Sequence, residues 1–162
     1  MKTSTKKELE NYFHLLFYIL LFNTAMITVT VVLHEGGHYI AGTYLGCQNA
    51  NIILLDSQTM STYTEMNCPP DVPLLPLLLS GFLLVIPFSL SFLILWGFPE
   101  KYFCWVIIGF NIIISISDIV LITDSFVFLF TLILGGFAMI VYGETLLINK
   151  FLIFIEQRKM VK

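Results

Sequence analysis

Charged residues are scarce in this chain. They make up 12% of its 162 residues, whereas a soluble domain carries about 25%. The mean hydropathy is +0.89, and 57% of the residues are hydrophobic. This composition argues against an ordinary soluble domain and indicates a protein that lies in the lipid bilayer.

Histidine, cysteine and net charge are also scarce, and each scarcity argues against a class of function or site. The chain has three histidines, too few for the several histidine boxes of a two-metal membrane desaturase or hydroxylase. Its three cysteines, Cys47, Cys68 and Cys104, form no CxxC pair and so do not by themselves predict a structural zinc site. A net charge of −3 without a basic patch argues against a nucleic-acid partner. The sequence contains no internal repeat of the kind from which many transporters are built, which argues against a transporter.

Long apolar runs, by contrast, are plentiful. About 20 apolar residues cross the hydrocarbon core as a helix, and the chain holds four such runs. The first has no signal-peptide cleavage site, so we expect it to be retained. The sequence therefore predicts an all-α membrane protein, one polytopic domain over residues 1–162, with spans at residues 12–45, 74–96, 102–122 and 126–148 and a polar loop at 47–71.

The polar loop predicts a short β-hairpin between the first and second spans. Residues 48–56 and 59–67 are rich in Ile, Leu, Thr and Tyr, and Asp56-Ser57-Gln58 supplies turn residues between them. Cys47 and Cys68 would face each other if the strands pair without a bulge. A disulfide and two free thiols both remain open, and free thiols are slightly favoured because the register is only inferred and the redox state of the compartment is unknown.

The basic residues predict the orientation. All eight lysines and arginines lie in the N-terminal segment, at position 101 or in the C-terminal segment, and the 47–71 loop has none. Cytoplasmic loops carry the excess of positive charge, so both termini are predicted to be cytoplasmic.

The strongest chemical signal is the HExxH motif at residues 34–38. His34 and His38 lie one helical turn apart, so their ring nitrogens can converge on one metal ion. Zinc lowers the pKa of its bound water to roughly 7, and Glu35 can take the proton and pass it to the leaving amine. Two histidines packed structurally in a bundle are the alternative, but ionisable residues at membrane depth are usually functional.

A catalytic zinc needs a third protein ligand and leaves its fourth position to water. Asp118, Asp124 and Glu144 are the acidic residues within reach of the membrane interior. Helix capping explains Asp124 without chemistry. The fourth span runs back toward the inner face, which puts Glu144 something like 20 Å from the level of the histidines. Asp118 is therefore the predicted third ligand.

Four further polar residues lie on the same helical faces. Asn111 and Ser115 share the face of the predicted aspartate, and Thr30 and Asn23 continue the stripe of the two histidines. They are candidates for supporting the ligands, positioning substrate or lining a water path. Hydrogen bonding between helices explains Thr30 and Asn23 equally well.

From about Val29 to Asp118 the sequence resembles the site-2 protease family of intramembrane zinc metalloproteases, as a minimal member. The matching text is Val32-Leu33-His34-Glu35-Gly36-Gly37-His38-Tyr39-Ile40-Ala41-Gly42-Thr43-Tyr44-Leu45-Gly46, followed by Asn51-Ile52-Ile53-Leu54-Leu55. In that family an aspartate in a later span, preceded by an asparagine, is the third ligand, and Asn111 and Asp118 match that role.

The sequence also departs from the family. The Asn-x-x-Pro and Asp-Gly elements are absent, with Ser115 and Asp118-Ile119 in their place, and a Gly-Pro element is represented at best by Ser80-Gly81-Phe82. Most family members are expected to hold zinc nearer the cytoplasm, whereas the charges here place it nearer the outer face.

The predicted function is hydrolysis of peptide bonds in membrane-embedded or membrane-adjacent substrates by zinc-activated water. The predicted partners are a membrane protein or peptide substrate and the lipid bilayer, and the oligomeric state stays open. An extended peptide could pair with the edge of the hairpin. The alternative is a non-catalytic membrane protein that binds metal or a partner through a pseudo-active site. Glu35 argues against it, because a pure metal site needs no base.

Overall fold

Four long helical segments make up most of the protein. The computed structural model describes residues 2–58, 61–95 and 100–160. These ranges contain four segments that are long and apolar enough to cross a membrane: Tyr12–Tyr44, Leu74–Ile94, Glu100–Val120 and Phe126–Ile153. The predicted all-α membrane fold with a hairpin between its first two spans is confirmed.

The spans are built from α1 (Lys2–Tyr44), α2 (Leu74–Ile94), α3 (Phe103–Ile114) with α4 (Ile116–Val120), and α5 (Phe126–Met160). A short 3-10 helix, η1 (Glu100–Tyr102), leads into α3. Helix α5 runs well past the predicted end at 148, because residues 149–160 contain neither glycine nor proline to stop it. The predicted end of the second span at 96 lies outside the described residues.

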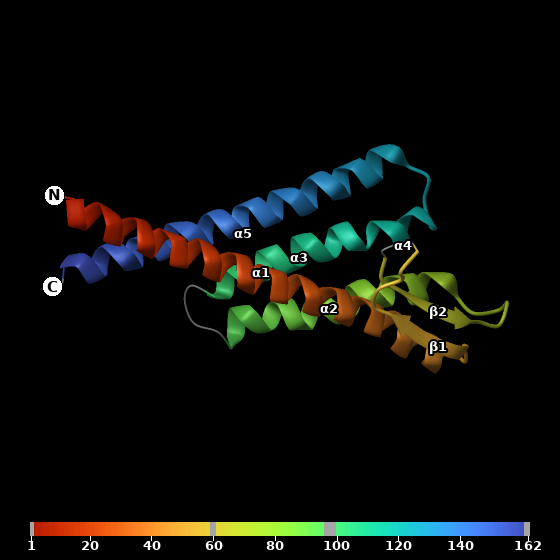
Figure 1. The fold of residues 1–162 in the computed structure, drawn as a ribbon. Coiled ribbons are helices and arrows are strands. Elements are labelled where there is room, and N and C mark those ends of the chain that lie inside the picture. Colours follow the sequence, from red (N-terminus) through yellow and green to blue (C-terminus); the bar gives the residue numbers. More distant parts are fainter. Residues whose placement is uncertain (1, 59–60, 96–99, 161–162) are drawn as a thin grey trace.

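The helices alternate in direction along the bundle (Figure 1). Helices α1 and α3 run toward the end that carries the hairpin, and α2 and α5 run back toward the end where both termini lie. The chain termini therefore share one end of the molecule, and the hairpin and α4 share the other (Figure 1).

Aromatic and aliphatic side chains fill the middle of the bundle. Val85 and Phe92 of α2 meet Phe103 and Ile107 of α3 in one buried cluster. Phe22 of α1 packs on Phe103 with ring centroids 4.2 Å apart. This packing fixes α1, α2 and α3 against one another below the hairpin end.

Helices α3 and α5 approach through glycines. A Cβ atom on Gly136 would lie 2.8 Å from the Gly109 carbonyl oxygen, and one on Gly143 would lie 3.1 Å from the Tyr102 carbonyl oxygen. Small residues allow helix backbones to come close in a membrane, where apolar side chains gain little by leaving lipid.

The hairpin pairs β1 (Gln48–Ile53) with β2 (Tyr63–Asn67) in antiparallel register. Both strands are shorter than predicted, because a wider loop joins them. In this loop the Asp56 backbone amide donates to the Ser61 carbonyl oxygen, and the Thr62 hydroxyl donates to the Leu54 carbonyl oxygen. The register shifts by one residue between Gln48 and Asn51, where Asn49 adopts a φ of 54°. Asparagine tolerates this left-handed conformation, so the strand carries a bulge there.

A disulfide joins Cys47 to Cys68. The sequence slightly favours free thiols, because the strand register is only inferred from it and the redox state of the compartment is unknown. The strands do carry a bulge, but it lies beyond the pair of residues next to the cysteines. Gln48 still faces Asn67, so the neighbouring cysteines stay opposite each other. Cys104 is free and lies in the buried core.

Candidate metal centre

The two histidines of the motif lie on the last turns of α1. The helix continues without a break through residues 34–38, so His34 and His38 project from the same face one turn apart. Both are buried, with 3% and 8% of their surface exposed, because α2 and α3 pack over this face. The expected convergence of the two rings is present.

Asp118 completes the group. Its Oδ2 atom lies 3.0 Å from Nε2 of His34 and 3.2 Å from Nε2 of His38, and the two Nε2 atoms are 3.2 Å apart. Ligand atoms of a tetrahedral zinc ion, each about 2.0 Å from the metal, are separated by about 3.3 Å. The triangle formed by these three atoms therefore has the size of one face of such a site, and the group can hold a metal ion.

The outer nitrogens of both rings are engaged. Nδ1 of His38 lies 2.9 Å from the Leu77 carbonyl oxygen, and Nδ1 of His34 lies 3.2 Å from Oδ1 of Asn111. The Asn111 amide nitrogen donates to the Phe82 carbonyl 3.1 Å away, so its oxygen must be the atom that faces His34. Each Nδ1 therefore faces an acceptor and carries a proton, which leaves both Nε2 lone pairs directed at Asp118.

This hydrogen-bonding pattern fits a cation. Without one, each ring would need a second proton, carried on Nε2, to donate a hydrogen bond to the Asp118 carboxylate. His34 and His38 would then be two positive rings with their Nε2 atoms 3.2 Å apart in a buried site. A metal ion replaces both protons and uses all three ligand atoms at once.

Gly81 of α2 forms one wall of this centre. A Cβ atom at that position would lie 2.6 Å from Nε2 of His38 and 2.9 Å from Nε2 of His34. Helix α2 comes this close because Gly37 of α1 also lacks a side chain: a Cβ there would overlap the Ser80 carbonyl and lie 2.8 Å from the Gly81 Cα. The sequence singled out Gly81 only as part of Ser80-Gly81-Phe82, and its place beside the ligands is a finding of the structure.

The Glu35 carboxylate is held by the hairpin. Glu35 is 9% exposed, and the Thr64 hydroxyl on β2 lies 2.8 Å from its Oε2 atom and 3.0 Å from its carbonyl oxygen. Sequence reasoning did not single out Thr64. The available signal was its place in the predicted second strand, on the same face as Met66.

Asn111 and Ser115 lie near the centre, as their shared face with Asp118 predicted. Asn111 contacts His34 directly, and the Ser115 hydroxyl donates to the Asn111 carbonyl oxygen at 2.7 Å. Ser115 is the one residue between α3 and α4, and such hydroxyl–carbonyl bonds often bend helices. Ser115 therefore sits where the span changes from the helix of Asn111 to the short helix of Asp118.

Thr30 and Asn23 find partners away from the metal ligands. The buried Thr30 hydroxyl donates to the Met26 carbonyl oxygen at 2.7 Å within α1. The Asn23 amide donates to Oε1 of Glu144 on α5. Asn23 precedes His34 by eleven residues, which separates them by about 16 Å along the helix. Glu144 accordingly lies far below the metal ligands, at the level that its position in the fourth span predicted.

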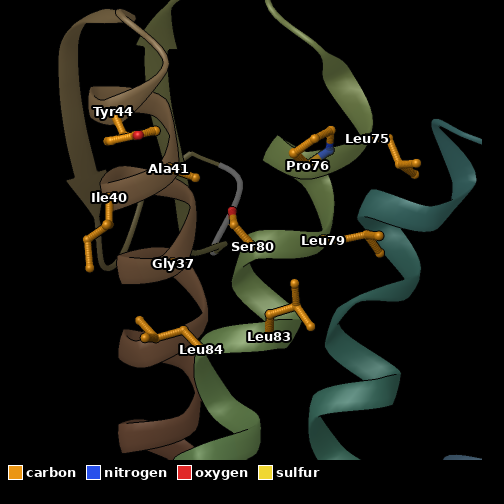
Figure 2. Close-up of a pocket in the computed structure, with 10 residues that line it drawn as sticks. All are labelled: Gly37, Ile40, Ala41, Tyr44, Leu75, Pro76, Leu79, Ser80, Leu83 and Leu84. Atoms are coloured by element: carbon orange, nitrogen blue, oxygen red, sulfur yellow. The ribbon is translucent and has the colours of Figure 1, made fainter.

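A groove of about 520 Å³ runs beside the centre between α1 and α2 (Figure 2). Figure 2 shows Gly37 and Ser80 where the two helices meet, and the Ser80 hydroxyl oxygen lies 3.4 Å from Nδ1 of His38. The groove is nearly all apolar, as suits a surface at the depth of lipid chains. Its lining comprises Gly37, Ile40, Ala41, Tyr44, Leu75, Pro76, Leu79, Ser80, Leu83 and Leu84.

Comparison with known proteins assigns no family. Searches against protein-family models, curated proteins and solved structures find no match to this chain. The geometry of the centre and the chemistry of its residues are therefore what point to a function.

Proposed function

We propose that this chain is an intramembrane zinc metalloprotease that hydrolyses peptide bonds of membrane-embedded or membrane-adjacent substrates. The observation that carries the proposal is the meeting of two imidazole Nε2 atoms and the Asp118 carboxylate oxygen within 3.2 Å of one another. The helix that carries the two histidines also carries the buried Glu35. Two histidines and one carboxylate are a ligand set of catalytic zinc sites, which keep the fourth position open.

The residues divide the chemistry among them. His34, His38 and Asp118 would hold zinc, and when bound the ion supplies the Lewis acid that makes water a nucleophile near neutral pH. Glu35 takes a proton from the attacking water as the new C–O bond forms. It then gives that proton to the amine nitrogen as the C–N bond breaks, so the peptide is cleaved with one water consumed.

The hairpin gives the centre a means of receiving an extended chain. A transmembrane helix hides its peptide bonds in its own hydrogen bonds, so a substrate must be unwound where it is cut. Strand β2 adjoins Glu35 through Thr64, and the hairpin lies at the same end of the bundle as α4 (Figure 1). A peptide that adds to the edge of the hairpin as a further strand would lie beside the centre.

We also propose that both termini face the cytoplasm and that the hairpin faces the opposite side. The two termini share one end of the bundle (Figure 1), and each lysine and arginine of the described residues lies in a segment that belongs to that end. A Gln58→Cys variant in a background without Cys47 and Cys68 should react with an impermeant thiol reagent added to intact cells. Labelling that requires broken cells would reverse the orientation.

The Glu35→Gln variant tests the activity. It removes the base and leaves the metal ligands in place, so the purified protein should keep its zinc and lose cleavage of fluorescein-labelled casein in detergent micelles by about 100-fold or more. His34→Ala should lose both zinc and cleavage. Wild-type protein that holds zinc and shows no Glu35-dependent cleavage would instead support a non-catalytic metal-binding protein.

A further inference from the structure

Strand β2 is fastened along the last turns of α1. Its end is tied by the Cys68–Cys47 disulfide just past the helix terminus. Two residues earlier, Met66 lies against Gly42, where an added Cβ would overlap the methionine sulfur. The strand and the end of the helix therefore run in the same direction, in contact at successive points.

Two residues earlier again, the strand reaches the proposed base. Thr64 and Met66 point to the same side because side chains alternate along a strand, and both are half-buried whereas Tyr63 and Glu65 are exposed. The Thr64 hydroxyl has one hydrogen to donate, and the Glu35 Oε2 atom at 2.8 Å is its nearer acceptor. Within the described part of the chain, this is the side chain that hydrogen-bonds to the Glu35 carboxylate.

We propose that Thr64 is a positioning residue that holds Oε2 of Glu35 and so leaves Oε1 to accept the proton of the attacking water. This inference rests on the proposed protease function. A glutamate side chain has three rotatable bonds, and neither the helix nor the metal ligands fix the last of them. Thr64 can fix it because its branched Cβ restricts χ1 and because the strand that carries it is attached to α1 on the side of Met66 and Cys68.

The Thr64→Val variant is the direct test, because valine keeps the shape of the side chain and removes the hydroxyl. The kcat for casein cleavage should fall about 10- to 100-fold, while KM stays within about two-fold and the zinc content is unchanged. Thr64→Ser restores the donor and should recover most of the kcat. The matched control is Thr62→Val, which removes the hydroxyl that donates to Leu54 within the same hairpin and should leave kcat unchanged.

Infrared spectroscopy tests the contact between Thr64 and Glu35 without any measurement of cleavage. The carboxylate stretching band assigned to Glu35 by its loss in Glu35→Gln should shift in Thr64→Val and return in Thr64→Ser. If Thr64→Val fails to fold, Thr64→Ala takes its place in both measurements. This band still decides the role of Thr64 if the wild-type protein cleaves nothing, in which case the protease proposal alone is lost.

Two outcomes overturn the inference. One is an active Thr64→Val protein with the kcat of the wild type. The other is a Glu35 band that does not respond to loss of the hydroxyl. A fall in kcat that Thr62→Val shares equally would also count against it, because general loosening of the hairpin would then explain the effect.

Discussion

The Gly81→Ala substitution adds one methyl group to the wall of the metal centre. An ideal Cβ atom at that position would lie 2.6 Å from Nε2 of His38 and 2.9 Å from Nε2 of His34, the atoms proposed to bind the metal. Carbon atoms pack comfortably at about 3.5–4.0 Å, so α2 or the two rings must move by about 0.5–1 Å. Movement of the rings spreads the triangle of ligand atoms, and movement of α2 draws the Leu77 carbonyl away from Nδ1 of His38.

The cost follows from the size of the overlap. An extra methyl forced into a packed site typically costs about 1–3 kcal/mol. If the rings bear that cost, zinc binding weakens by about 5- to 150-fold, at 1.4 kcal/mol for each factor of ten. Competition against a chromophoric zinc chelator, together with metal content after dialysis, measures the loss, and circular dichroism checks that the helices remain.

Two glycine substitutions serve as controls. Gly36→Ala lies within the motif itself, and its added methyl would be 3.8 Å from the nearest atom, Cδ2 of Leu84. Gly135→Ala on α5 would meet nothing within 4 Å. Both should bind zinc like the wild type. Equal affinities for Gly81→Ala and Gly36→Ala in folded proteins would refute the placement of Gly81 against the ligands.

Two further predictions concern the third ligand and the disulfide. Asp118→Ala should remove most of the zinc from the purified protein. Glu144→Gln alters a carboxyl group that is bound to Asn23 far from the histidines, so it should leave the zinc content unchanged. The reverse result in metal analysis would contradict the proposed ligand set. Replacing Cys47 and Cys68 by serine removes a link across a sequence separation of 21 residues, worth about 3 kcal/mol in the chain-entropy view. Limited proteolysis should then cut the hairpin faster than in the wild type, and two alkylatable thiols in protein purified without reductant would show that no bridge forms.

The features that could be predicted depend on spacing along one helix or on depth in the membrane. Run length alone located the four spans, because the bilayer sets how many apolar residues a helix needs. The i, i+4 spacing of His34 and His38 placed both on one face. The direction of each span separated Asp118 from Glu144, and the structure puts the first beside the histidines and the second beside Asn23.

The features that escaped prediction depend on contacts between elements. Nothing in the local sequence distinguishes Thr64 from other strand residues, because its contact with Glu35 depends on how β2 packs along α1. The position of Gly81 beside the histidines likewise depends on how α2 packs against α1. Asn23 shows the limit of helical stripes: it shares a face with His34, yet its hydrogen-bond partner lies on α5 rather than at the metal centre. Residues on one face of a helix point in the same direction. They can still contact different helices, because the helix that packs on that face changes from one end of it to the other.

The hydrogen bond between Asn23 and Glu144 has a consequence for how the protein is made. It joins the first span to the last, so during synthesis Asn23 enters the membrane long before its partner exists. Glu144 in turn can leave water at low cost only if α1 is already in place to receive it. Insertion of the final helix and closure of the bundle should therefore be one event. A nascent chain that stops short of residue 144 would hold the Asn23 amide in the membrane without this partner.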